Sequence, residues 1–155
     1  MRVLLRGLCG VVMLASSAAA DVKAYHGAFC IPSVGEFDEP IYSGDGILNF
    51  DSTDLSITCP LIRDQMNNAN TLVDVQIEVH NDAGAITCTL ESQDEDSAGT
   101  VLDFDTVGTS SIGDRQLSGF VVVASAGSEG SYSLGCSLGP DDILYHYRLE
   151  ENDKG

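Results

Sequence analysis

Tryptophan is absent from the 155-residue chain, and basic residues are scarce, with seven lysines and arginines against 24 aspartates and glutamates. The formal net charge is −17 at pH 7. A surface with this charge repels phosphate backbones and anionic lipid headgroups, which argues against nucleic acid and membrane-surface partners. The acids are spread along the chain, as in a solvated surface adapted to a salty or calcium-containing exterior, rather than gathered into one cation site.

Motifs of catalysis are also missing. The sequence contains no G-x-S-x-G, no H-E-x-x-H and no Cys–His pair. Of the three histidines, His80 and His146 fall on the outward faces of expected strands, where a solvated histidine is the simplest interpretation. We therefore expect no catalytic residue and no enzymatic activity, although a small hydrolase that uses a pair of carboxylates stays an alternative in so acidic a chain.

Long apolar runs are missing after residue 20. The first twenty residues, MRVLLRGLCGVVMLASSAAA, combine Arg2 and Arg6 with a short apolar run and a small-residue cleavage pattern at its end. The apolar run is shorter than the ~20 residues that a membrane span needs. We expect residues 1–20 to be a signal peptide cut after Ala20. Residues 21–155 should then form one secreted or periplasmic domain without a membrane segment.

Four cysteines follow the expected cleavage position, and no two of them are close in sequence. Zinc sites need closely spaced ligand pairs, whereas an even number of cysteines in an exported protein indicates disulfides. Four cysteines allow three pairings. Cys88 and Cys136 both fall in the middle of expected strands on inward faces, which favours the pairs Cys88–Cys136 and Cys30–Cys59.

Most of the chain alternates apolar and polar residues with a period of two, the pattern of half-buried strands. The clearest example, LVDVQIEVH at 72–80, precedes a turn and the strand AITCTLES, which predicts an antiparallel hairpin over 72–92. Residues 119–125, 132–138 and 143–151 should form three consecutive antiparallel strands, with Ile143, Tyr145 and Tyr147 inward. About eight short strands with Gly-rich turns indicate an all-β domain, an antiparallel β-sandwich or jelly roll with two disulfides.

The segment QDEDSAGTVLDFD at 93–105 is the only candidate metal site. Asp94, Asp96, Gly99 and Asp105 occupy positions 1, 3, 6 and 12 of a twelve-residue calcium loop. Ala98 at position 5 offers no side-chain oxygen, and no helices are expected beside the segment. A solvated turn between two strands is therefore the favoured interpretation, with calcium at Asp94, Asp96 and Asp105 as the alternative.

The motifs GAFC (27–30), CPLIRD (59–64), GSYSLGCSLGP (130–140) and YHYRLEE (145–151) together resemble a loose group of small exported bacterial proteins without an assigned activity. The resemblance implies a secreted two-disulfide β domain and supplies no catalytic residue. The sequence thus predicts a non-catalytic extracellular domain with a binding or structural role and a protein or carbohydrate partner. A calcium-dependent module that binds carbohydrate or another surface ligand is the main alternative.

Overall fold

The computed structural model describes residues 21–33, 41–62, 72–82, 84–94, 100–123 and 131–152. These residues form eleven strands and one short 3-10 helix. The elements are β1 (Asp21–His26), η1 (Gly27–Phe29), β2 (Ile31–Pro32), β3 (Ile41–Ser43), β4 (Gly46–Leu48), β5 (Leu55–Pro60), β6 (Leu72–Asn81), β7 (Ile86–Asp94), β8 (Thr100–Thr109), β9 (Gly113–Val123), β10 (Ser131–Leu138) and β11 (Ile143–Asn152). Within the described residues, no helix is long and apolar enough to cross a membrane.

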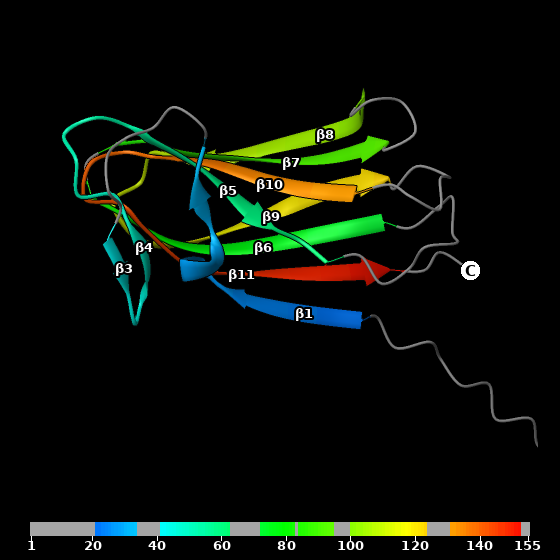
Figure 1. Cartoon of the computed structure of the whole chain (residues 1–155), viewed down its shortest axis with the longest axis horizontal. Helices are drawn as coiled ribbons and strands as arrows, with labels where there is room; N and C mark the ends of the chain where they lie inside the picture. The colour runs from blue at the N-terminus through cyan, green and yellow to red at the C-terminus, as the bar shows by residue number, and fades with distance from the viewer. Residues whose placement is uncertain are drawn as a thin grey trace, which may run out of the picture.

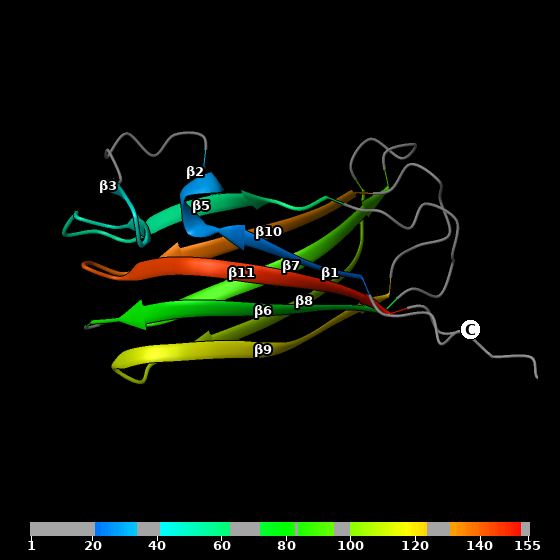
Figure 2. The ribbon, with the colours of Figure 1, turned by 90° about the horizontal axis from the view of Figure 1, so that it is seen from below.

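Two antiparallel sheets lie face to face (Figure 1). Sheet A has the order β3-β4-β11-β6-β9, with β1 also paired to β11, and sheet B has the order β2-β5-β10-β7-β8. Figure 2 shows β1, β11, β6 and β9 of sheet A side by side, with strands of sheet B behind them. The expected all-β sandwich with two disulfides is therefore confirmed.

The core lies between the sheets and follows from the alternation of the sequence. Val73, Val75, Ile77 and Val79 of β6 are fully buried, and the residues between them face outward. Strand β10 shows the same strict alternation of buried and half-buried residues. Each sheet therefore has one apolar inner face and one polar outer face, as expected for antiparallel sheets in a sandwich.

The expected hairpin over 72–92 is wrong. Strand β6 pairs with β11 and β9 in sheet A, whereas β7 pairs with β10 and β8 in sheet B. The three C-terminal strands likewise alternate between sheets A, B and A instead of pairing with one another. The physical reason is that alternation shows only that one face of a strand is buried. It does not distinguish a partner beside the strand from one across the core.

The number of strands and the phase of the last strand also differ from expectation. The short strands β2 and β3 were not expected, and β9 begins at Gly113 instead of near residue 119. In β11, Leu144, Tyr147 and Leu149 are buried, whereas Ile143 and Tyr145 are only half-buried. The ladder between β11 and β6 shifts between Leu144 and His146. This bulge adds one residue, so the inward phase predicted for Ile143 and Tyr145 fails.

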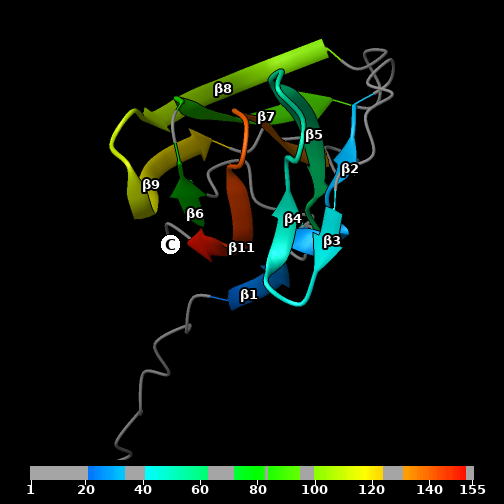
Figure 3. The same cartoon turned by 90° about the vertical axis from the view of Figure 1, so that its left-hand side faces the viewer.

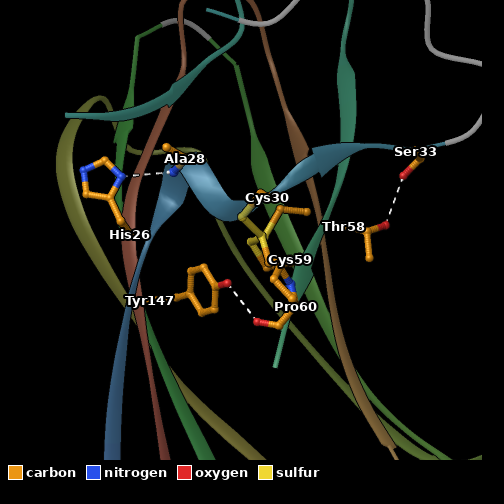
Figure 4. The surroundings of a disulfide bond; sticks show 10 residues. His26, Ala28, Cys30, Ser33, Thr58, Cys59, Pro60 and Tyr147 are labelled. Carbon is orange, nitrogen blue, oxygen red and sulfur yellow. Dashed lines mark hydrogen bonds between the residues drawn. A yellow bond between two sulfur atoms is a disulfide. The ribbon is translucent and has the colours of Figure 1, made fainter. Parts of the chain in front are cut away.

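Both expected disulfides are present, Cys30–Cys59 and Cys88–Cys136. Cys88 lies directly opposite Cys136 in the ladder between β7 and β10. Cys30–Cys59 instead ties the segment after η1 to β5 (Figure 4). Beside it, the buried Tyr147 hydroxyl donates to the Pro60 carbonyl at 2.8 Å, and burial raises the Tyr147 pKa. Contacts around this bridge therefore connect the two sheets.

Three buried polar residues fasten the connections between the sheets at one end of the sandwich, the end that faces the viewer in Figure 3. Asn49 Nδ2 donates to the carbonyls of Thr53, Leu138 and Gly139. Asp142 accepts from the backbone N–H groups of Asp82 and Gly139. Asn81 Nδ2 donates to the carbonyls of Gly84 and Ser111. These three residues, the polar clasp, bond to backbone groups of the turns, and the bonds at Leu138 and Gly139 satisfy backbone that is buried.

Candidate functional site

The outer face of sheet A carries polar side chains in cross-strand rows. In one row, Glu78 of β6 lies between His146 of β11 and Gln116 of β9. In the next row, His80 of β6 lies opposite Asp114 of β9. Directly opposite residues of antiparallel strands share one face with Cβ atoms about 4.5–5.5 Å apart, so these five side chains form one continuous polar surface.

The bulge in β11 adds Tyr145 to this surface. Without the extra residue, unbroken alternation from the buried Tyr147 and Leu149 would turn Tyr145 inward. In the structure, the Tyr145 hydroxyl instead donates to Asp114 Oδ1 at 3.2 Å, across the intervening strand β6. Bulges commonly redirect a side chain beside a functional site.

Asp114 is held as an oriented hydrogen-bond acceptor. Its Oδ1 atom accepts from His80 Nδ1 at 2.7 Å as well as from Tyr145. These two hydrogen bonds lower the pKa of the Asp114 carboxyl below its ordinary value. The Tyr145 pKa is raised by partial burial and by the charge of Asp114. At neutral pH, Asp114 is therefore ionised and Tyr145 is protonated.

The neighbouring row is held in a similar way. His146 Nε2 lies 3.1 Å from Glu78 Oε2, and Gln116 Nε2 donates to Gln76 Oε1 at 2.9 Å. The histidines predicted as solvated strand residues therefore each contact one carboxylate. These contacts engage one oxygen of each carboxylate, and within the described part of the chain the second oxygen stays available for a ligand.

These residues surround a shallow hollow of about 330 Å³, which we call the outer-face depression; it is lined by Glu78, Val79, Asp114, Arg115, Gln116 and Tyr145. Its volume lies at the lower end of the range for small-molecule sites. The Arg115 guanidinium donates to the backbone carbonyls of Asp114 and Ile112 at 2.8 and 2.6 Å. Two of its five N–H donors are thus engaged by the protein itself. Its other donors, the carboxylate and amide oxygens and the Tyr145 ring are left to meet a ligand.

A second shallow groove of about 280 Å³ lies on the outer face of sheet B. It is lined by small residues, among them Ser56, Thr58, Thr89 and Gly135. The described residues that line the groove include neither an aromatic ring nor a charged side chain. It therefore offers a ligand fewer anchoring groups than the outer-face depression, which is the stronger candidate site.

Asp74 lies on the same outer face but away from the depression. It is opposite Glu150 in the ladder between β6 and β11. Burial raises the Asp74 pKa, the charge of Glu150 raises it further, and Arg148 opposes the rise. Because the pKa in the folded state exceeds the unfolded value, ionised Asp74 destabilises the fold above that folded pKa, and stability is regained as the pH falls through it.

Replacing Asp74 with asparagine is therefore expected to stabilise the protein at pH 7. The gain should be at most about 0.5 kcal/mol, the ordinary size for a half-exposed position, and should vanish as the pH approaches 4. Urea unfolding at pH 7, 5.5 and 4 measures it, with Asp54→Asn at an exposed position as the control. An equal gain at all three pH values would contradict the assignment to Asp74 ionisation.

The candidate calcium residues are not brought together in the described part of the chain. Strand β7 ends at Asp94, which lies opposite Thr100, whereas Asp105 lies opposite Leu90. Four residues of strand separate the two positions by about 14 Å along the hairpin. Asp96 lies outside the described residues. Among the described ones, no three His, Cys, Asp or Glu side chains gather to hold a metal ion. Calcium binding at Asp94, Asp96 and Asp105 stays a prediction.

Asp105 and its neighbour Asp103 have a different contact. Among the described strands, β8 pairs with β7 alone, which makes its other side an edge of sheet B. Asp103 Oδ1 accepts from the backbone N–H of Phe104 at 3.0 Å, and Asp105 Oδ1 accepts from that of Thr106 at 2.8 Å. Side chains that occupy edge N–H groups, and that carry charge, oppose pairing with a strand of another molecule.

Replacing both Asp103 and Asp105 with alanine is accordingly expected to cause self-association. Analytical ultracentrifugation over a hundredfold range of protein concentration should show the average mass rising toward that of a dimer. The variant Asp103→Asn/Asp105→Asn keeps an acceptor oxygen at each position but loses the charge, which separates hydrogen bonding from repulsion. A double alanine variant that stays monomeric throughout would show that these contacts do not protect the edge.

Comparisons with known proteins do not assign the chain to a family. No protein-family model matches the sequence, and no curated protein matches it. Among solved structures, the C-terminal CBM6 of LamC, a marine laminarinase from Zobellia galactanivorans, has a TM-score of 0.49 at 12% identity, covering 84% of this chain and 99% of that one.

Two larger proteins also match in structure. A GH26-CBM35 β-(1,4)-mannanase from Podospora anserina has a TM-score of 0.44 at 15% identity over 86% of this chain and 28% of its own. The enzymatically active domain of tailspike protein 4 from bacteriophage CBA120 has a TM-score of 0.41 at 10% identity, over 84% of this chain and 17% of its own. All three TM-scores are below 0.5.

Proposed function

We propose that the chain is a non-catalytic extracellular domain that binds carbohydrate, and that the sugar occupies the outer-face depression. The observation that supports this most directly is the position of the Tyr145 ring beside oriented oxygens of Asp114 and Glu78. A sugar ring presents hydroxyl donors on its rim and C–H groups on its faces. Fixed carboxylates accept from the hydroxyls, and an aromatic ring packs against the C–H groups.

The chemistry of the depression favours binding over catalysis. A carboxyl that acts as a general acid at neutral pH needs a raised pKa, whereas hydrogen bonds lower the pKa of Asp114. No serine, threonine or cysteine is among the described residues that line the depression. The cysteines at 30, 59, 88 and 136 are all in disulfides, so none of them is a free nucleophile. The alternative of a carboxylate-based hydrolase therefore gains no support at this site.

The proposed location outside the cell has two supports. Disulfides form and persist in oxidising compartments such as the periplasm and the extracellular space. The two disulfides of the structure fit such a compartment. The signal peptide predicted for residues 1–20 would direct the chain there. Cleavage can be checked by mass spectrometry of the exported protein.

Titration with soluble oligosaccharides tests the function. Isothermal titration calorimetry against a panel of neutral and charged oligosaccharides is expected to find at least one ligand. Tyr145→Ala should weaken its binding at least tenfold, because the ring and its contact to Asp114 are both lost. Tyr42→Ala is the matched control, since Tyr42 is an exposed tyrosine of the same sheet, on β3, and is not among the described residues that line the depression. Binding that is unaffected by Tyr145→Ala, or absent for every oligosaccharide, would contradict the proposal.

A further inference from the structure

The charges around the outer-face depression are unbalanced. Two carboxylates, Glu78 and Asp114, line it; a histidine contacts one oxygen of each, and no hydrogen bond from another described residue engages the second oxygen. Among the described lining residues, Arg115 is the one cation, and its guanidinium donates to backbone carbonyls on its own strand and the preceding turn. With two carboxylates against one guanidinium, the described residues that line the depression have a negative net charge.

The net charge of the whole chain is negative, like that of the depression. The chain has a formal net charge of −17, so a negatively charged ligand approaches this face against a strong repulsion. A neutral ligand experiences no such force, and a cationic ligand is attracted. Both the local acceptors and the overall charge therefore select for a donor-rich, positively charged group.

We infer that the outer-face depression prefers saccharides that carry a protonated amine over neutral or anionic ones. This inference rests on the proposed function, because it names the class of sugar for the same site. The ammonium group would donate to the free oxygens of Glu78 and Asp114, and the ring of the sugar would contact Tyr145. An ammonium has three donors, so it can bridge two carboxylates, whereas a hydroxyl has only one. The lowered pKa of Asp114 keeps this acceptor ionised at mildly acidic pH, where sugar amines are protonated.

Calorimetric titration with four probes tests the preference. The probes are a glucosamine tetramer, its N-acetylated counterpart, a neutral glucose tetramer and tetralysine, all at a pH at which the glucosamine amines are protonated. The glucosamine tetramer is expected to bind at least tenfold more tightly than the N-acetylated and glucose tetramers. It should also bind more tightly than tetralysine, which carries the charge without the sugar.

Two variants locate the effect. Asp114→Asn and Glu78→Gln should each weaken binding of the glucosamine tetramer about tenfold and leave binding of the neutral tetramers within about threefold. Glu150→Gln is the matched control, since it removes the same charge from the outer face of sheet A outside the depression. If Glu150→Gln weakened binding of the glucosamine tetramer as much as Glu78→Gln, the preference would come from the overall negative charge of the protein and not from the depression. That result would overturn the inference.

Failure of the amine preference and failure of carbohydrate binding give different results in these titrations. Neutral tetramers that bind as tightly as the glucosamine tetramer, with Tyr145→Ala still disruptive, would overturn the inference and support the proposed function. Equal binding of tetralysine and the glucosamine tetramer would overturn the inference, because no sugar would then be recognised. No binding of any saccharide would overturn both.

Discussion

Replacing Asn49 with alanine is expected to lower the free energy of unfolding by about 3 kcal/mol. The buried Asn49 amide donates to the carbonyls of Thr53, Leu138 and Gly139, and its Oδ1 accepts from the Asp51 N–H. Each hydrogen bond contributes roughly 1 kcal/mol, and buried carbonyls left without donors cost more. Asn49 is almost completely buried, so bulk solvent does not reach these groups while the side chain is in place.

Urea unfolding at constant pH and salt measures this loss. Asn49→Asp tests the direction of the hydrogen bonds, because aspartate keeps the acceptor and size but places a negative charge against carbonyl oxygens. It should destabilise the protein at least as much as alanine does. Ser52→Ala, at an exposed position in the same connection, should change stability by less than about 0.5 kcal/mol. An Asn49→Ala loss below 1 kcal/mol would show that the polar clasp contributes little.

The importance of Asn49 could not be seen in the sequence. Asn49, Asn81 and Asp142 stand among turn residues, and a turn asparagine or aspartate is usually solvated or bonded to its own backbone. Their burial arises only because connections between the two sheets meet at one end. The hairpin predicted over 72–92 would have placed its turn at the edge of one sheet. The prediction therefore did not indicate that connections between the two sheets meet at this end. The faces of the strands were predictable from alternation, but their neighbours were not.

Prediction of the candidate site failed for a related reason. The outward faces of His80 and His146 were predictable, because they lie between buried positions of β6 and β11. Their carboxylate partners depend on the order of strands in sheet A, which places β6 between β11 and β9. Tyr145 was expected in the core, because no sequence signal marks the extra residue of the bulge. The depression thus combines three strands that are distant in the chain with one local irregularity.

The disulfides show where sequence reasoning reached the correct pairing. Two inward cysteines in the middle of strands can meet across the core or side by side, and Cys88 and Cys136 meet side by side in sheet B. With that pair assigned, Cys30 and Cys59 were the remaining pair. The pairing was therefore predictable without the strand order, because it needed only the inward faces of Cys88 and Cys136.

Removing the Cys88–Cys136 bridge is expected to destabilise the protein by about 4 kcal/mol. The bridge closes a loop with a sequence separation of 48 residues. In the chain-entropy model, closing a loop of this length restricts the unfolded chain by about 4 kcal/mol, against about 3.6 kcal/mol for the separation of 29 residues at Cys30–Cys59. Since the seven-residue ladder between β7 and β10 remains, the folded state of Cys88→Ala/Cys136→Ala should be retained.

Thermal unfolding of Cys88→Ala/Cys136→Ala should show a Tm roughly 10–15 °C below that of the parent protein. Since both cysteines are buried, part of the loss could come from the space left by the sulfur atoms. The variant Cys30→Ala/Cys59→Ala separates the loss of the bridge from the loss of sulfur volume. It is unfolded with and without a thiol reductant, because reduction breaks Cys88–Cys136 and keeps its sulfur atoms. A fall in Tm of less than 4 °C on reduction would contradict this prediction. It would mean that β7 and β10 already stay close together in the unfolded ensemble, so that the bridge restricts the unfolded chain little.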